Sequence, residues 1–210
     1  AVIGLDLDLV KDICTKIVKE FEHDSINCIE IEGKYLDLQC KPTVEVANIN
    51  SDQQIVISGS KILVEKASKL CEDAGARRIL KLPVSAPFHS SLLAKAAIRL
   101  RERLRKEHLQ PPKISVINNI DVMEMKSTDE ISESLAKQAM STVRWSESIR
   151  KMESMGISVF VECGPGRILT GLTRKICPKI NIFSLSEKKS FYETIKFLER
   201  NPIGNLSQNG

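Results

Sequence analysis

The sequence predicts a mixed α/β fold in two parts. Residues 1–85 show local patterns in the order strand, helix, strand, strand, helix, strand, and residues 86–200 continue to alternate helices with short apolar strands. Hydrophobic residues make up 42% of the 210 residues but aromatic residues only 4%, so we expect a core of aliphatic side chains. This length suits one large domain or two small ones.

Four strands and two helices account for the first part. Apolar residues recur at helical spacing after Asp8, a residue type that caps helix N-termini. A second helix is predicted to begin after Ser60 and to stop at Gly75. The predicted strands are residues 1–4, 44–48, 54–58 and 79–84, with an irregular insertion at 24–42 that holds one short strand near 28–31. This order is the split βαβ arrangement called ferredoxin-like.

A helical pattern opens the second part directly after residue 89. Its predicted buried stripe consists of Leu92, Leu93, Ala96, Ala97, Leu100 and Leu104. Further helices are predicted to begin near residues 127, 145, 168 and 191, strands at 114–118, 157–161 and 180–185, and a frayed tail at 201–210. The apolar run 157–161 is typical of a central parallel strand. Three strands are too few for such a sheet, so we expect a missing segment, N-terminal to this chain.

Composition and motifs exclude several classes of function. The net charge of +4 is too small to indicate a nucleic-acid-binding protein, although it would tolerate an acidic partner. The sequence has no apolar run of about 18 residues, no Cys/His cluster with zinc-ligand spacing, and neither GxGxxG nor a Walker lysine. Most of the six cysteines lie in apolar patterns, which suits reduced and buried thiols. We therefore expect no membrane span, no metal and no nucleic acid.

Residues 82–90, LPVSAPFHS, place a histidine where a predicted strand meets a helix. His89 is one of three histidines, and the other two, His23 and His108, lie among charged neighbours. Because the unperturbed pKa of histidine is near neutral pH, a histidine at such a turn can transfer protons. The position also suits a histidine that caps or packs against the helix, and local context alone slightly favours that structural interpretation. No GxSxG motif is present, so the chain has a candidate base without a nucleophile.

Three other polar motifs each admit two interpretations. Asn48 and Asn50 flank a hairpin, where asparagine is common for reasons of turn geometry but can also contact a ligand. Asn118 and Asn119 admit the same two interpretations. The loop 162–166, ECGPG, joins a predicted strand to a helix, which suits either a tight turn or a phosphate-binding loop.

Taken together and in order, these motifs resemble the malonyl-CoA:acyl carrier protein transacylases, the acyltransferases of type II fatty-acid synthesis. The resemblance rests on VANIN with QIVISG, LPVSAPFHS, VINNID, KQ with VRW, and VECGPG with LTGLT. It covers residues 1 to about 185. It implies a ferredoxin-like small subdomain at 1–85 and part of an α/β-hydrolase-like large subdomain at 86–200.

The resemblance also implies roles for single residues. His89 matches the catalytic base, and Gln138 matches the position whose backbone carbonyl orients that base. Asn48, Asn50 and Phe88 match residues that bind the acyl group, where the bulk of Phe88 would disfavour an α-methyl branch. The implied reaction passes malonyl from malonyl-CoA, through an acyl-serine, to the phosphopantetheine thiol of acyl carrier protein. It requires no metal and no other cofactor.

Three family features are absent from this sequence: the GQGSQ-type stretch, the serine of GHSLG, and the arginine that pairs with the malonyl carboxylate. The chain therefore resembles the C-terminal two-thirds of the family, and we expect it to be inactive by itself. We expect a monomer that binds malonyl-CoA and the acidic carrier protein. Arg77, Arg78 and Lys81 are the candidates for contact with the carrier, since they are basic and near His89 in the sequence.

Other interpretations remain open at this point. The chain could be an acyltransferase domain of a modular polyketide or fatty-acid synthase, or a catalytically dead scaffold or binding module. An RNA-recognition domain stacks bases on aromatic residues of its central strands, and residues 44–48 and 54–58 contain none. The family's pathway places the protein in a bacterial cytoplasm or in the stroma of a plastid- or apicoplast-type organelle.

Overall fold

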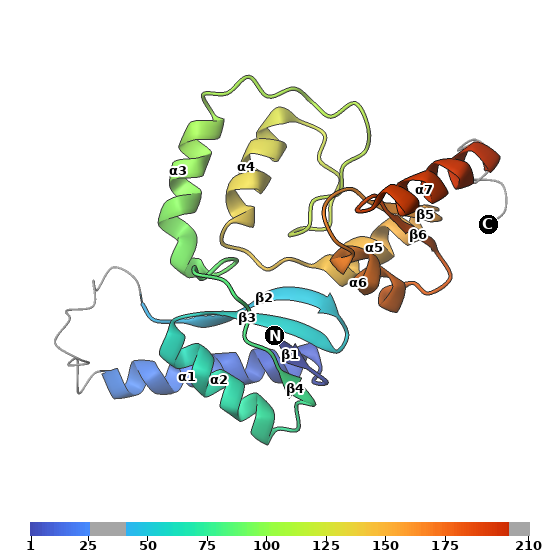
Figure 1. Ribbon diagram of the computed structural model, residues 1–210. Coiled ribbons are helices and arrows are strands. Elements are labelled where there is room, and N and C mark those ends of the chain that lie inside the picture. The colour runs from blue at the N-terminus through green and yellow to red at the C-terminus, as the bar shows by residue number, and fades with distance from the viewer. Residues whose placement is uncertain (26–40, 202–210) are drawn as a thin grey trace. The chain divides into compact units, whose positions relative to one another are not determined.

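The computed structural model describes residues 1–25 and 41–201, and its fold is mixed α/β, as the sequence predicts (Figure 1). Contacts divide the chain into two compact units, Ala1–Trp145 and Ser146–Gly210. The predicted short strand near 28–31 lies outside the described residues, as does the predicted tail after residue 201. The predicted division at residue 85 stays a prediction.

The first unit begins with a four-stranded antiparallel sheet. Its strands are β1 (Val2–Ile3), β2 (Val44–Ser51), β3 (Gln54–Gly59) and β4 (Arg78–Ile79). They lie in the order β2-β3-β1-β4, and helices α1 (Leu7–Ser25) and α2 (Lys61–Asp73) follow β1 and β3 in the sequence. The succession of strands and helices is the one that the sequence predicts.

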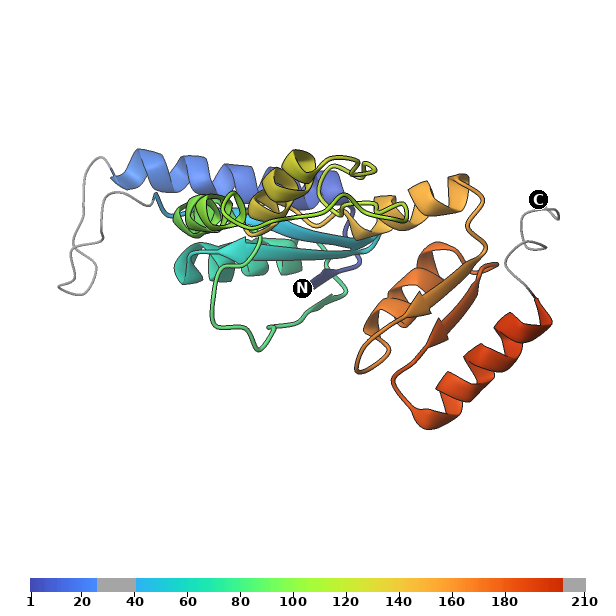
Figure 2. The same ribbon diagram turned by 90° about the horizontal axis from the view of Figure 1, so that it is seen from above.

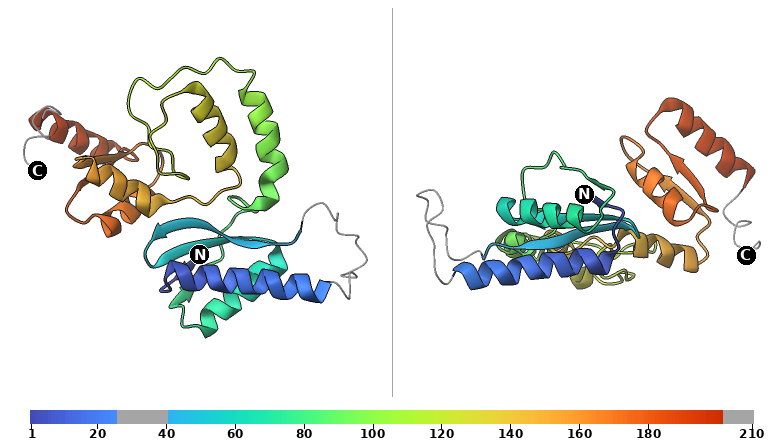
Figure 3. Two further views of the ribbon diagram at one scale, coloured as in Figure 1. Left: turned by 180° about the vertical axis from the view of Figure 1, so that it is seen from behind. Right: turned by 90° about the horizontal axis from the view of Figure 1, so that it is seen from below.

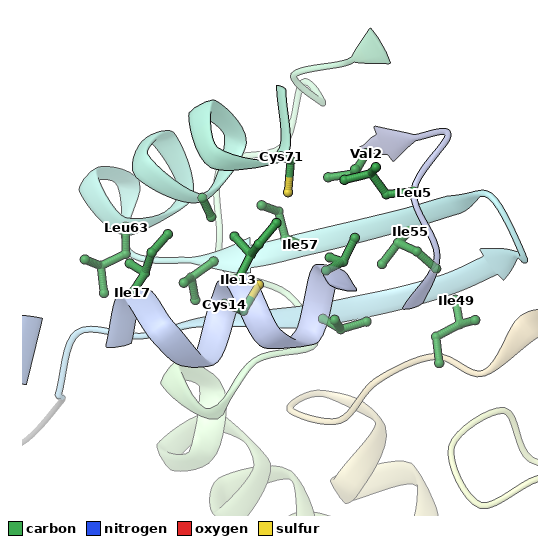
Figure 4. Packing of buried hydrophobic residues seen from close by; sticks show 14 residues of the cluster. Val2, Leu5, Ile13, Cys14, Ile17, Ile49, Ile55, Ile57, Leu63 and Cys71 are labelled. Atoms are coloured by element: carbon green, nitrogen blue, oxygen red, sulfur yellow. The ribbon is translucent and has the colours of Figure 1, made fainter. Parts of the chain in front are cut away.

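Helices α1 and α2 lie side by side against one face of this sheet (Figures 1 and 3). Aliphatic side chains from both helices and from the sheet meet between the two layers (Figure 4). The buried members of this core are Val2, Leu5, Val10, Ile13, Cys14, Ile17, Val44, Val46, Ile49, Ile55, Ile57, Leu63, Ala67 and Cys71. Each large aliphatic side chain that is fully buried contributes roughly 1.5–3 kcal/mol, so this core stabilises the unit.

Two predicted helix caps need correction. The side chain that caps α1 belongs to Asp6 and not to Asp8, because the Asp6 carboxylate accepts the backbone N–H of Leu9 at 2.9 Å. Ser60 precedes α2 as predicted, but its hydroxyl makes no cap within the helix. It accepts the N–H of Thr43 at 3.2 Å instead, and so it ties the helix start to the neighbouring strand.

The predicted strand at 79–84 is wrong beyond Ile79, where β4 ends. Pro83 has no N–H to donate to a neighbouring strand, and the N–H of Val84 donates to the carbonyl of Leu82 at 2.9 Å. Leu80 still exchanges backbone hydrogen bonds with Ala1, and the local turn follows after it. The segment that leads to His89 is an exposed loop rather than a strand.

A bulge in β2 changes which of its side chains face the core. Val44, Val46 and Ile49 belong to the core, so the spacing is two residues and then three. The pairing with β3 shifts register between Val46 and Asn48, and one additional residue is accommodated there. Asn48 is therefore excluded from the core face that a regular alternation would have given it.

Helices α3 (Ala94–Leu104) and α4 (Thr128–Gln138) pack side by side in the first unit (Figure 1). The prediction of a wide buried stripe on the first of them is wrong, because Ala97 is buried while Ala96 and Leu100 are exposed. One neighbouring helix covers only a narrow strip of α3. The predicted start of α4 is confirmed by a capping box in which Ser127 and Glu130 exchange hydrogen bonds.

The strand predicted at 114–118 is wrong. Only a single bridge, between Ile117 and Glu124, is formed there. The side-chain oxygen of Asn118 accepts the N–H groups of Ile120 at 3.1 Å and Asp121 at 2.7 Å. This Asx-type turn reverses the chain before a strand can extend. The geometry thus favours the turn interpretation of Asn118.

The second unit holds a two-stranded parallel sheet. Its elements are α5 (Trp145–Ser154), β5 (Val159–Glu162), α6 (Ile168–Ile176), β6 (Asn181–Ser184) and α7 (Lys188–Arg200). The parallel pairing of β5 with β6 agrees with the prediction from the apolar run. Helices α6 and α7 lie on opposite faces of the two strands (Figure 2).

Candidate functional site

The loop that carries His89 is held in an unusual backbone conformation. His89 has φ of +60°, in the left-handed region that costs a residue with a side chain about 1–2 kcal/mol. The next residue, Ser90, is fully buried and donates its hydroxyl to the carbonyl of Pro87 at 2.7 Å. Such a conformation persists only where surrounding contacts hold it.

The C-terminal end of α4 supplies two of these contacts. Nδ1 of His89 lies 2.8 Å from the carbonyl oxygen of Gln138, and the backbone N–H of His89 donates to Ala139 at 3.1 Å. The last carbonyls of a helix have no partner within that helix, so they are free to accept these groups.

The tautomer of His89 follows from its partner. A carbonyl oxygen can only accept, so Nδ1 must carry the hydrogen in this contact. In the neutral ring Nε2 then holds the free lone pair and can take a proton. A main-chain carbonyl thus fixes the orientation of the ring and leaves Nε2 without a partner in this contact.

The segment after α4 is attached to the edge of β2. The hydroxyl of Thr142 donates to the Val46 carbonyl at 2.7 Å. The N–H of Val143 donates to Ala47 and the N–H of Ile49 donates back to Val143, both at 2.8 Å. These bonds form a parallel bridge between Val143 and Asn48. The contacts thus bring Asn48, Gln138 and His89 into one neighbourhood.

An open depression of about 930 Å³ lies beside His89. Its lining includes four of the sequence-predicted residues, namely Asn48, Lys81, Phe88 and His89. The lining does not include Asn50, Arg77 or Arg78. Phe88 is 49% exposed, so its ring is free to contact a ligand that enters from solvent.

Cysteine offers no activated nucleophile at the buried described positions. Burial raises the pKa of Cys14 to about 12, with Cys71 and Glu45 adding to the effect. Burial together with the hydrogen bond to Glu153 raises the pKa of Cys177 to about 11. These thiols stay protonated near neutral pH, and they therefore serve packing rather than catalysis.

The ECGPG loop is a tight turn, and the free N–H groups at the start of the following helix, α6, are already bound by a side chain of the loop itself. The Glu162 carboxylate accepts the N–H of Leu169 at 3.1 Å, and the N–H and hydroxyl of Thr170 at 2.7 and 2.6 Å. Burial opposes ionisation, but these hydrogen bonds outweigh it and lower the pKa of Glu162. The carboxylate occupies the place that a phosphate would take at the start of α6, so the phosphate-loop interpretation is disfavoured.

Comparison with known proteins decides the family. The acyl transferase domain family matches residues 26–179 of this sequence. The chain belongs to this family. Together with the relatives described next, this match confirms the resemblance predicted from the ordered motifs.

Several members of the acyl transferase domain family are similar over nearly all of this chain. Malonyl CoA-acyl carrier protein transacylases from Haemophilus influenzae and Bacillus subtilis are 36% and 33% identical, over 94% and 95% of the chain. An acyl-carrier-protein S-malonyltransferase from Burkholderia pseudomallei has a similar crystal structure, with a TM-score of 0.80 and 37% identity over 93% of the chain. The chain covers 57%, 56% and 57% of these three proteins, respectively.

A further structure similar to this acyl transferase family member contains a partner. It is a type II PKS acyl-carrier protein in complex with its malonyl-transacylase, with a TM-score of 0.81 and 32% identity. It is matched over 95% of this chain and 57% of that one. This chain thus spans little more than half the length of its relatives.

The described residues hold neither a membrane-spanning helix nor a metal-binding cluster. None of the described helices is both long and apolar enough to cross a membrane. Within residues 1–25 and 41–201, no group of three or more His, Cys, Asp or Glu side chains is arranged to hold a metal ion.

Two residues near His89 escaped the sequence analysis. The Glu45 carboxylate accepts the N–H of Ser91 at 3.1 Å and also the Ser91 hydroxyl. A glutamate in an alternating strand ordinarily faces solvent, and Ser91 resembles any serine at a helix start. No local signal could have paired them, because 46 positions separate them.

Proposed function

We propose that the chain carries the general-base part of a malonyl-CoA:acyl carrier protein transacylase. The observation that carries this proposal is the 2.8 Å contact between Nδ1 of His89 and the carbonyl of Gln138. The activities named for the relatives supply the substrates. Since the chain spans 57% of the first relative, we assign the activity to a protein of the relatives' length that contains these residues, called the full-length protein below.

The proposed reaction has two halves with matched proton transfers. A serine hydroxyl from outside this chain attacks the thioester carbonyl of malonyl-CoA, and Nε2 of His89 takes its proton. The carbon–sulfur bond then breaks, and the imidazolium returns the proton to the departing CoA sulfur. In the second half, the phosphopantetheine thiol gives its proton to His89 while its sulfur attacks the acyl-serine. The serine oxygen recovers that proton as the ester breaks.

The acyl group is assigned to the side of His89 that carries Asn48 and Phe88. Both residues line the same depression as His89, which supports this assignment. Asn50 lies two positions further along β2 and is assigned to the same pocket from the resemblance alone. The bulk of Phe88 would disfavour a substrate with an α-methyl branch.

The first part of the chain is assigned as the ferredoxin-like small subdomain of the family. Its βαββαβ order and its antiparallel strand order β2-β3-β1-β4 support this assignment. The parallel pair β5 and β6 is assigned to the α/β-hydrolase-like large subdomain. Further strands of that subdomain would come from the remaining length of the relatives.

The carrier protein is assigned to a basic surface near the site. Arg77, Arg78 and Lys81 are exposed, and Lys81 lines the depression beside His89. An acidic carrier would be attracted to such a surface. A monomeric state stays a prediction, and a location in a bacterial cytoplasm or an organelle stroma is predicted from the family's pathway.

Replacing the proposed base tests the function. In the full-length protein, His89→Ala should lower the rate of malonyl transfer by about 10³-fold or more, because no other group takes the serine proton. His108→Ala is the matched control, since this histidine is exposed. Transfer is followed as malonyl carrier formed from malonyl-CoA. An unchanged rate in His89→Ala, with the protein folded, overturns the proposal.

Charge reversal tests the carrier surface. Arg78→Glu should raise KM for the carrier protein several-fold and leave KM for malonyl-CoA unchanged, because only the carrier is a large acidic partner. Lys113→Glu, at another exposed site, changes the net charge equally and serves as control. Equal effects of the two variants would contradict a specific docking surface.

A further inference from the structure

The contacts that hold the His89 loop come from the end of α4, from the loop itself and from β2. Gln138 and Ala139 contact His89 from the end of α4. Ser90 makes a bond within the loop, to Pro87. The remaining tie is Glu45 of β2, which accepts the backbone N–H and the hydroxyl of Ser91. Glu45 is thus the one side chain of the sheet in this set that reaches the loop.

The Glu45 carboxylate is itself fixed by a third donor. The hydroxyl of Thr43 donates to its Oε1 at 3.1 Å, and Thr43 lies just before β2. Ser91 is the first residue of the short 3₁₀ turn Ser91–Leu93, which leads directly into α3. The carboxylate therefore caps the start of this helical segment from a neighbouring strand. The Glu45 carboxylate thus fixes the backbone at Ser91, two residues after His89 with its positive φ.

Strand β2 holds both members of the pair formed by His89 and Gln138. Glu45 binds the loop on the histidine side. One to four residues further along the strand, Val46, Ala47 and Ile49 bind the segment that follows Gln138. The distance between the imidazole and its carbonyl partner is thus set by two attachments to one short stretch of strand.

We propose that Glu45 is a positioning residue for His89: by binding Ser91, it holds the loop in the conformation that keeps Nδ1 on the carbonyl of Gln138. This inference rests on the proposed function only in treating His89 as the base. Without the clamp, the left-handed conformation at His89 loses one of its restraints, and the ring moves away from its acceptor. Nε2 is then no longer held in the orientation that takes the serine proton, so kcat falls more than the affinity for substrate.

If Glu45 only capped the helical segment, its replacement would have a different effect. It would change stability and leave the geometry of the ring in the folded protein unaltered. Glu45→Ala should instead lower kcat of the full-length protein by about 10–100-fold, with KM for malonyl-CoA within about twofold. Glu45→Gln keeps an acceptor oxygen for Ser91 and should restore kcat to within about threefold of the parent. Glu102→Ala, an exposed glutamate of α3, is the matched control.

The histidine ring provides a second readout that does not depend on activity. In ¹⁵N spectra of the folded full-length protein, His89 should show hydrogen on Nδ1 in the neutral state. Glu45→Ala should convert this to a mixture of tautomers, and Glu45→Gln should return it toward the parent spectrum. If Glu45→Ala fails to fold, Ser91→Ala decides, because it removes the hydroxyl contact and leaves the N–H contact. It should then shift kcat and the tautomer in the same direction by a smaller amount.

The outcomes separate the two proposals. A tautomer change in Glu45→Ala together with an active His89→Ala protein would overturn the catalytic role of His89 but keep the positioning contact. An inactive His89→Ala protein together with an unchanged ring and kcat in the folded Glu45 variants would overturn the positioning role alone. Equal loss in Glu45→Ala and Glu102→Ala would likewise contradict it.

Discussion

The four-stranded sheet of residues 1–79 and the two-stranded sheet of Ser146–Arg200 bury different kinds of side chain. The first closes over aliphatic residues, several of them with no exposed surface. In the second, hydroxyl-bearing residues outnumber the buried hydrophobic residues Ile149, Leu172 and Cys177. The buried hydroxyl-bearing residues are Ser146, Ser148, Thr170, Thr173, Ser184, Ser190 and Thr194.

The exposed residues show the same contrast. Ile168 is 77% exposed at the start of α6, and the adjacent Leu169 is 40% exposed. Strand β5 is apolar for three of its four residues, yet all four are only half-buried. An apolar strand becomes a core strand only when neighbouring strands and helices close around it. In the first region α1 and α2 close one face of four strands, whereas two strands offer too little surface.

The largest expected difference between the regions concerns deletion of an aliphatic side chain. Ile55→Ala should lower the free energy of unfolding by about 2–5 kcal/mol, because Ile55 is fully buried in the sheet core and a cavity would remain. Ile168→Ala should change it by less than about 0.5 kcal/mol. Urea unfolding of both variants measures the contrast. Similar losses for the two would mean that the second region is closed as tightly as the first.

A second contrast concerns glycine. A Cβ at Gly59 would lie 2.1 Å from the carbonyl oxygen of Thr43, which belongs to backbone that cannot move without disturbing the β2–β3 pairing. Gly59→Ala should therefore cost about 2–3 kcal/mol. Gly166→Ala meets no atom within 4 Å, and only its positive φ of +84° is unfavourable, at about 1 kcal/mol. Thermal unfolding of the two variants tests this order, and a reversed order would contradict it.

The smallest expected effect concerns the helix cap of the second region and depends on pH. The pKa of Glu162 is lowered in the folded state, so its stabilisation is complete above the ordinary value of 4.5 and is lost as the pH falls through the lowered folded value. Glu162→Gln should lower the free energy of unfolding by about 1 kcal/mol near neutral pH. The reason is that the negative charge that accepts three hydrogen bonds is lost.

The difference between parent and Glu162→Gln should then shrink toward zero in acid, below the lowered pKa. Unfolding midpoints across the acid range measure it. The control variant is Glu199→Gln, on the exposed side of α7. Glu153 is unsuitable as a control because its carboxylate binds the thiol of Cys177. A difference that stays constant with pH would contradict the role of the Glu162 charge.

Local pattern predicted the order of elements well and their ends less well. Helical spacing located α1, α2 and α4, and the predicted start of α4 near residue 127 agrees with the structure. The strand predicted at 79–84 was too long, because its pairing with β1 stops at Leu80, which exchanges backbone hydrogen bonds with Ala1. Pro83 also has no N–H for a ladder, a signal that was present in the sequence. The wide stripe on α3 failed because periodicity shows which face is apolar but not how much of it a neighbour covers.

The candidate site divides in the same way. The sequence by itself determined the alternation of strands and helices, the histidine at the start of a helical segment, and the family, since these depend on neighbouring residues and on ordered motifs. The family resemblance implied that the carbonyl of Gln138 orients His89, and the tertiary structure shows the two atoms 2.8 Å apart. Only the tertiary structure decided that Ser91 is held by Glu45. The partners of Ser91 and His89 lie 46 and 49 positions away, and a local pattern carries no information about which distant residues the folded backbone brings together.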